Sequence, residues 1–247
     1  MPSEQTEVRV NLRLMLTLLS DTTFGRGDGV AGLVDEEVEH DAATGLPTIR
    51  GRVLKGLLTE ECANLLFALD RANPAAARRG RAAAEALFGR PGSRLNDDGA
   101  LRLGTATLPD ELCRAVEAGV LAERLKPTAS EVMGLKPTDV LASITDIRRQ
   151  TATDFATGAP KRNSLRNMRV VLRQTLFSAP LDVRFPDERA QSDGLALLAA
   201  CVLALRRGGM GRNRGRGRIQ ARLHDAGGAD ITAQHFARFT AWLGGEA

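Results

Sequence analysis

Residues 8–18 read VRVNLRLMLTL, and this stretch decides the fold. Its even positions are all apolar, whereas its odd positions include Arg9, Asn11 and Arg13. Successive side chains of a strand point to opposite faces of a sheet. A period of two over this length therefore predicts a long strand with one buried face. The polar residues 20–23 end it, and a loop with glycines at 25, 27, 29 and 32 follows.

The elements expected after this strand alternate between helices and strands. A helix is predicted to begin near Arg52, because apolar residues then recur at spacings of three and four up to Leu69. Leu101 and Leu103 indicate a short strand, and residues 175–185 indicate a longer one. An apolar helix over 195–205, which Gly208 and Gly209 would stop, precedes a strand over 219–223 and a short terminal helix.

This order predicts an α+β, ferredoxin-like domain: strand–helix–strand, an insertion, then strand–helix–strand again. The insertion would be residues 126–178, whose prolines and polar content suit an excursion from the core. Residues 71–98, rich in Ala, Arg and Gly, are expected to be irregular. At 247 residues, the chain is expected to form one domain over 1–247.

Composition narrows the possible functions. Hydrophobic residues make up 43% and charged residues 26%, as in ordinary globular proteins. There is no Tyr, so a tyrosine stacking platform and a Tyr acid or base are excluded. Three cysteines without a CxxC pair favour a reducing compartment. With neither a signal sequence nor an apolar run of membrane-spanning length, we expect a cytoplasmic protein without membrane contact.

Positive charge is concentrated in two windows, although the formal net charge is only +4. No acidic residue lies between Asp154 and Asp182, or between Asp193 and Asp225, and both windows are rich in Arg. The guanidinium group can bind phosphate through two donors at once. The second window includes the loop 206–219, where glycines free backbone N–H groups for the same purpose. We therefore expect a phosphate-binding surface for nucleic acid, with affinity that falls as salt rises.

Four motifs in the same order resemble the RAMP superfamily, and in particular the backbone subunits of type III CRISPR effector complexes. The first is the glycine loop after the first strand, and the second is GLVD at 32–35 followed by GLPTIRGRVLKG at 45–56. The third is DIRRQTA at 146–152 with Leu165 and Arg166 beyond it, which resembles a thumb hairpin. The fourth is the glycine-rich run 208–217, where Asn213 stands in place of the family's usual Ser.

The resemblance implies an RNA-recognition-type fold whose thumb, within 126–178, interrupts a guide–target duplex. It implies CRISPR guide RNA and target single-stranded RNA as partners, with other RAMP subunits and a large polymerase-like subunit. Asp35 would be the catalytic residue for target cleavage, either holding a divalent metal, Mg or Mn, or positioning the attacking 2′-hydroxyl. A single carboxylate is an incomplete metal shell, and its neighbours Glu36, Glu37, His40 and Asp41 are expected to be solvated.

The residues expected to bind RNA lie in three parts of the sequence: the start of the first helix, the thumb and the glycine-rich loop. They are Arg50, Arg52, Lys55, Arg148, Arg149, Arg162, Arg166, Gly208, Gly209, Arg212, Asn213, Arg214 and Arg216. For the thumb arginines, salt bridges within the thumb are the competing interpretation.

Two other functions stay open. The chain could be a purely architectural RNA-binding subunit without catalysis, in which Asp35 only forms a turn. It could also be an endoribonuclease that processes the guide, although that chemistry relies on His, Tyr or Lys and only His224 and His235 are available late in the chain. A metabolic enzyme with a phosphate loop is disfavoured, because the glycine loop here precedes a strand and not a helix.

Overall fold

A four-stranded antiparallel sheet forms the centre of the protein in a computed structural model, which describes residues 7–30, 32–90, 99–126 and 134–244. The strand order is β2-β5-β1-β6, with β1 at Val8–Leu18, β2 at Leu101–Leu103, β5 at Leu176–Phe185 and β6 at Ile219–His224. In register, β1 pairs Val8 with Phe185 of β5 and Leu18 with Ile219 of β6. This is the ferredoxin-like order, so the predicted fold class is confirmed.

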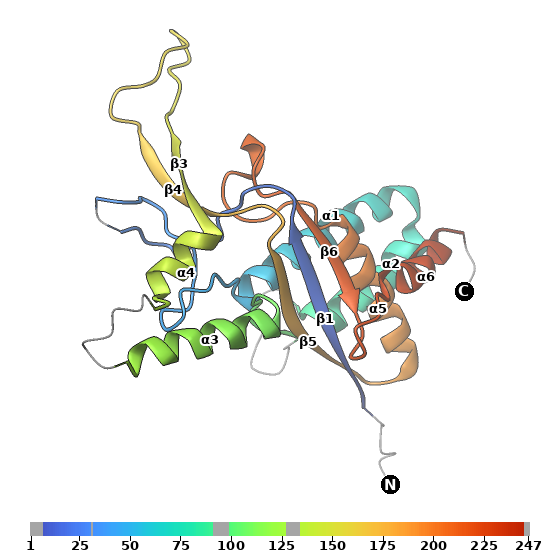
Figure 1. Ribbon diagram of the computed structural model, residues 1–247. Helices are drawn as coiled ribbons and strands as arrows, with labels where there is room; N and C mark the ends of the chain where they lie inside the picture. Colours follow the sequence, from blue (N-terminus) through green and yellow to red (C-terminus); the bar gives the residue numbers. More distant parts are fainter. Residues whose placement is uncertain (1–6, 31, 91–98, 127–133, 245–247) are drawn as a thin grey trace.

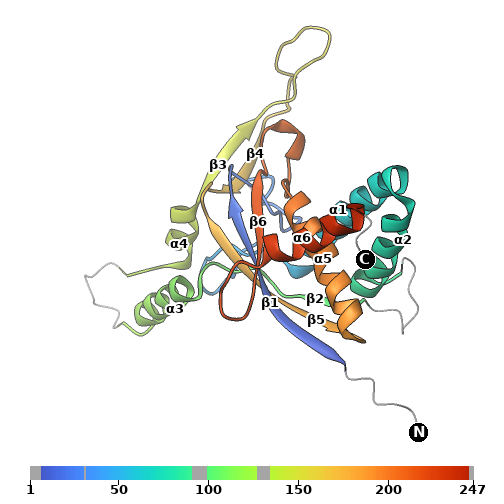
Figure 2. The same ribbon diagram turned by 90° about the vertical axis from the view of Figure 1, so that its right-hand side faces the viewer.

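Four helices cover one face of the sheet (Figure 2): α1 at Gly51–Ala72, α2 at Pro74–Phe88, α5 at Glu188–Ala204 and α6 at Thr232–Gly244. The even-numbered leucines of β1 point into this layer, and Leu14 and Leu18 are completely buried. The helix α5 is buried all round from Gly194 to Val202, because it lies between the sheet and the other helices. The core is therefore the layer between the sheet and these helices.

The prediction of irregular structure over 71–98 is wrong, because α2 occupies Pro74–Phe88. Its buried side is built of small residues, which gave no stripe of large apolar side chains to detect. Ala is the strongest helix former, and the side chain of Asn73 accepts hydrogen bonds from the amides of Ala75 and Ala76 at the N-terminus. A side chain at Gly80 would place its Cβ 2.8 Å from Leu66 Cδ2 on α1, so the small residues allow close helix packing. Residues 91–98 lie outside the described part of the chain.

Two further helices, α3 at Asp110–Arg124 and α4 at Pro137–Ile144, lie on the opposite side of the sheet from the main helical layer (Figure 2). The sequence did not predict either helix. The helix α5 also begins earlier than predicted, at Glu188, where the side chain of Asp187 caps it, and it ends at Ala204 before the glycine pair.

A two-stranded hairpin projects away from the sheet (Figure 1). It consists of β3 at Thr145–Gln150 and β4 at Arg166–Val171, paired so that Arg149 lies opposite Asn167. The hairpin and α4 lie within residues 126–178, of which 127–133 are outside the described residues. At its tip, Phe155 is fully exposed.

Across the described ranges, no helix combines the length and the apolar character that a membrane crossing requires.

Candidate nucleic-acid interface

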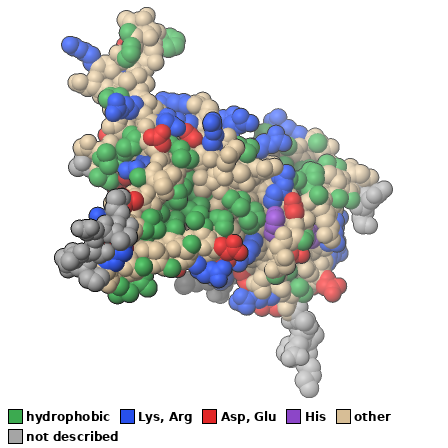
Figure 3. All heavy atoms as spheres, in the orientation of Figure 1, with side chains coloured by type: hydrophobic (Ala, Val, Ile, Leu, Met, Phe, Trp, Pro, Cys, Tyr) green, Lys and Arg blue, Asp and Glu red, His purple; other side chains and the backbone are tan. Residues whose placement is uncertain are grey.

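Thr22 and Thr23, in the loop after β1, bring the two basic windows together. The amide of Thr22 donates to Val171 O at the end of β4 (3.0 Å), and the amide of Met210 in the glycine-rich loop donates to Thr23 O (2.8 Å). Segments about 40 residues apart in sequence therefore lie on either side of one short stretch of backbone. Lys and Arg side chains gather along the edge of the molecule at the base of the hairpin (Figure 3).

A groove of about 400 Å³ lies where the hairpin, the glycine-rich loop and the loop after β1 meet. Glu36 comes from the loop after β1. The hairpin supplies Gln150 and residues 166–168, and the glycine-rich loop supplies residues 209–214. Of the residues predicted to bind RNA, the structure brings Arg166, Gly209, Arg212, Asn213 and Arg214 into the lining of this groove.

The glycine-rich loop needs glycine at two positions for steric reasons. Gly217 has φ +71°, and a Cβ there would lie 2.1 Å from Gly208 O. Gly209 has φ +73°, and its Cβ would lie 2.5 Å from Thr23 O. Residues with side chains rarely adopt such φ values, so these glycines set the path of the loop. Between them, a short 3₁₀ turn over Arg212–Arg214 carries the basic side chains.

The arginines of this loop differ in how much of their charge is neutralised. Arg212 forms an exposed ion pair with Glu60 (3.0 Å), whereas Arg214 lies near the side-chain amide of Gln150 and has no ion pair in the described ranges. Arg216 has no ion pair with any residue in the described ranges, and its Nη1 lies 3.5 Å from Met168 Sδ. Burial, and then the positive charge of Arg148, lower the pKa of Arg216. Among the described residues, no carboxylate is therefore ion-paired with Arg214 or Arg216.

Arg148 anchors the hairpin to the sheet. Its guanidinium donates two hydrogen bonds to Asp21 (2.7 and 3.0 Å) and also pairs with Asp146. Burial alone would raise the pKa of Asp21, but hydrogen bonds from Arg148 and from the amide of Arg173 outweigh it and lower that pKa. The salt bridge that competed with RNA binding at Arg148 is thus present, whereas Arg149, Arg162 and Arg166 are exposed.

Glu37 corrects the expectation that the acidic residues around Asp35 are solvated. Its side chain is buried, and Oε1 lies 2.7 Å from Nε of Arg169 on β4. Arg169 also donates to Thr145 Oγ1 across the hairpin. Because both charges are neutralised inside the protein, Arg169 does not add to the basic surface, and the pair joins the loop after β1 to the hairpin.

Asp35 is exposed beside the hairpin. Its Oδ2 accepts a hydrogen bond from the amide of Asn167 (2.7 Å), and its own amide donates to Asn167 O (2.8 Å). In the ranges that the structure describes, no group of three or more His, Cys, Asp or Glu side chains is arranged to hold a metal ion. The residues around Asp35 therefore do not form a metal site of their own.

The three basic residues predicted at the start of α1 do not line the groove. Arg50 pairs with Glu39 (2.6 Å), and Lys55 Nζ donates to Leu101 O (3.1 Å), so both contribute to the fold. Arg52 is exposed on the first turn of α1. Gly208 is buried, and Arg216, which is half-buried, is not among the groove residues, although its guanidinium lies against Met168, which is.

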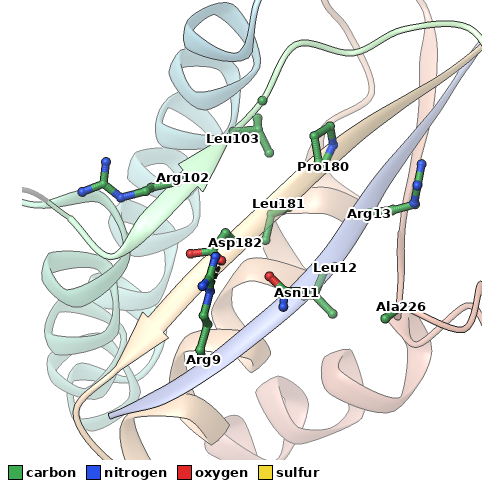
Figure 4. Close-up of a pocket in the computed structure, with 11 residues that line it drawn as sticks. Arg9, Asn11, Leu12, Arg13, Arg102, Leu103, Pro180, Leu181, Asp182 and Ala226 are labelled. Carbon is green, nitrogen blue, oxygen red and sulfur yellow. Dashed lines mark hydrogen bonds and ion pairs between the residues drawn. The ribbon is translucent and has the colours of Figure 1, made fainter.

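A second hollow, of about 550 Å³, lies on the face of the sheet away from α1, α2, α5 and α6, which we call the open face (Figure 4). Arg9 and Asp182 on neighbouring strands form an ion pair there, and Arg13 and Arg102 also line it. Outward-facing positions of β1, β2, β5 and β6 include neither Phe nor Trp. With the imidazole of His224 as its one aromatic side chain among the described strand residues, this face is less suited to stacking bases than the groove is to binding phosphates.

Several groove residues were missed from the sequence. Gln150, Asn167, Met168 and Met210 lie within the motifs and charge windows, but they are neither charged nor glycine, so the sequence did not single out their side chains. Tertiary contacts place them in the groove: the loop after β1 bridges to Met168 on β4 and to Met210 in the glycine-rich loop, and Gln150 pairs with Arg166 across the hairpin.

The fold and the groove define a ferredoxin-like domain with a projecting hairpin and a basic, glycine-rich loop at the hairpin's base. The family model of the RAMP superfamily matches residues 15–220, so the chain belongs to the RAMP superfamily. No curated protein matches the chain in sequence.

Solved structures show the same fold. One is a chain from a cryo-EM structure of the type III-B Cmr-beta bound to cognate target RNA, with a TM-score of 0.57 and 15% identity over 86% of this chain and 96% of that chain. Another is a chain of type III-B Cmr-beta in the apo state, with a TM-score of 0.56 and 14% identity over 87% of this chain and 97% of that chain.

Proposed function

We propose that this chain is an RNA-binding backbone subunit of a type III CRISPR effector complex, and that it holds a guide RNA paired with its target. Membership of the RAMP superfamily and the fold shared with the Cmr-beta chains support this assignment. The observation that carries it is the groove at the base of the hairpin, where the hairpin and the glycine-rich loop present Arg166, Arg212 and Arg214 together. The proposed partners also include other RAMP subunits and a large polymerase-like subunit.

Binding would be independent of RNA sequence. The groove offers guanidinium groups and backbone amides, which recognise phosphates and carry no information about bases. Arg149 and Arg162 extend the positive charge along the hairpin toward Phe155 at its tip. An exposed aromatic ring can stack on any base, so the tip suits a hairpin that separates one base pair from the next.

We further propose that Asp35 promotes cleavage of the bound target RNA. Asp35 is exposed next to Arg166, and the amide of Asn167 fixes Oδ2. Its Oδ1 can accept a hydrogen bond from a ribose 2′-hydroxyl and orient it toward the adjacent phosphate. Mg or Mn, when bound, would neutralise charge on that phosphate. Since the protein supplies one carboxylate, the remaining ligands of such an ion would be phosphate oxygens and water.

The test compares the wild-type protein with Asp35→Ala on a guide RNA paired with a labelled target, with Mg or Mn added. Cleavage at regular spacing should be lost in Asp35→Ala, while the Kd for RNA stays within about twofold because a carboxylate does not attract phosphate. Asp28→Ala is the matched control, since Asp28 is an exposed carboxylate of the same loop, paired with Arg26. Cleavage that persists in Asp35→Ala would overturn the catalytic role.

The architectural alternative predicts RNA binding without cleavage by the wild-type protein. Processing of the guide has little support from the site, because neither His224 nor His235 lines the groove and His235 is buried. Metal-independent cleavage of repeat RNA by the purified protein would favour it instead.

A further inference from the structure

The backbone at Asp35 and Glu36 pairs with β4 of the hairpin through an isolated bridge. Asp35 N donates to Asn167 O (2.8 Å), Glu36 N also approaches Asn167 O (3.4 Å), and Arg169 N donates to Glu36 O (3.0 Å). Glu36 and Met168 form a parallel bridge. The backbone around Asp35 is therefore hydrogen-bonded to β4 of the hairpin.

The side chain of Asn167 adds a second tether to this attachment. Its Nδ2 donates to Leu33 O (3.2 Å), two residues before Asp35. Leu33 lies in a tight turn, in which the amides of Leu33 and Val34 both donate to Val30 O (3.0 Å). One residue of β4 thus holds the turn through its side chain and the Asp35 carboxylate through its backbone amide.

We propose that Asn167 is a positioning residue for the reaction at Asp35, and that it makes the orientation of the Asp35 carboxylate depend on the position of the hairpin. This inference rests on the proposed function. Asn167 is opposite Arg149 in the hairpin and next to Arg166, both of which are exposed for RNA. An RNA strand that shifts these arginines therefore shifts the backbone to which Asp35 is bonded, with no flexible linker between them.

The geometry gives a specific expectation for side-chain variants. In Asn167→Ala and in the uncharged, similarly sized Asn167→Leu, the donor to Leu33 O is lost, but the amide of residue 167 can still bond to Asp35. The turn is then released on one side, and the carboxylate is held less well. Small misplacements of a reacting group can cost a large factor in rate, so target cleavage should slow by roughly 10- to 100-fold.

The experiment measures single-turnover cleavage and RNA binding separately, in the full-length protein with guide and target RNA. Both variants should slow cleavage while the Kd for RNA changes by less than about twofold, because neither alters the charge of the groove nor removes Arg166, Arg212 or Arg214, the arginines that line it. Asn11→Ala is the matched control, because Asn11 is an exposed asparagine in the middle of β1, on the open face of the sheet. It should cleave at the wild-type rate.

Hydrogen exchange gives a readout that needs no cleavage. Amides of residues 33–36 should exchange faster in Asn167→Ala, while those of β1 and α5 should not change. Wild-type cleavage rates in both Asn167 variants would overturn the inference, as would equal losses of cleavage and RNA affinity, which would mean that the hairpin is merely damaged. Unchanged exchange at 33–36 would also overturn it. If the wild-type protein cleaves nothing, the proposed function fails at Asp35, and the exchange data show separately whether the tether exists.

Discussion

Removing the charge of three arginines in the glycine-rich loop should change the salt dependence of RNA binding by a calculable amount. The variant is Arg212→Gln, Arg214→Gln and Arg216→Gln together. Arg214 and Arg216 have no carboxylate partner among the described residues, and the pair between Arg212 and Glu60 is exposed and so weak. We expect all three to be available for phosphates.

Each phosphate neutralised on single-stranded nucleic acid contributes about 0.7 to the slope of log K against log salt concentration. Losing three such contacts should therefore reduce the slope by about 2. Between about 50 and 200 mM salt, the wild-type affinity should fall by a factor roughly 20 greater than that of the variant. At low salt the wild type should bind much more tightly, and the difference should shrink as salt is added.

The assay is a titration of labelled single-stranded RNA at four or more salt concentrations, with two unrelated RNA sequences. A matched control replaces Arg9, Arg13 and Arg102, which lie around the hollow on the open face of the sheet (Figure 4), and changes the net charge equally. The reasoning is refuted if this control lowers the slope as much as the loop variant does. It is also refuted if the loop variant binds one of the two sequences as well as the wild type does.

Three other predictions concern single positions. Gly217→Ala should lower the free energy of unfolding by about 1–3 kcal/mol and weaken RNA binding, because its Cβ would meet Gly208 O. Gly215→Ala is the control, because Gly215 has a similar positive φ but open space around it. In urea unfolding it should cost about 1 kcal/mol or less. Burial lowers the pKa of His235 below its ordinary 6.5. The unfolded chain therefore binds more protons, and stability should fall as pH drops below about 6.5. In His235→Gln the urea midpoint should change less between pH 7.5 and 5.5 than in the wild type, and an equal change would contradict the assignment. Phe155→Ser should leave the urea midpoint unchanged but weaken RNA binding by the equivalent of about 1–3 kcal/mol if the ring stacks on a base; equal affinities would exclude stacking.

The sheet could be predicted from the sequence because its strands have one buried face. The alternation in β1 and the apolar stripe of α1 each report burial on one side, and both predictions are confirmed. The helix α2 escaped prediction because its contact with α1 uses Ala and Gly, so its buried face carries little hydrophobic contrast. Patterns of large apolar residues do not detect close packing of small ones.

The candidate site was predictable only in its parts. The charge window pointed to Arg214 and Arg216, and the glycine-rich run included Gly217, because a local excess of arginine and of glycine can be read directly from the sequence. The sequence did not show that Glu37 neutralises Arg169, or that Lys55 bonds to Leu101 O, because those partners are far away along the chain. Whether a basic residue is free for a ligand depends on tertiary contacts, and its own sequence neighbourhood does not reveal them.

The open face of the sheet has one further consequence. Its outward side chains are mainly arginines, carboxylates, amides and small or aliphatic groups; the one aromatic ring among its described strand residues is the imidazole of His224, and neither Phe nor Trp is present. A protein with this surface has little means of preferring one base sequence. Under the proposed function, the choice of target would therefore depend on the guide RNA that the protein carries. The same chain could then serve any new guide without a change in its own gene.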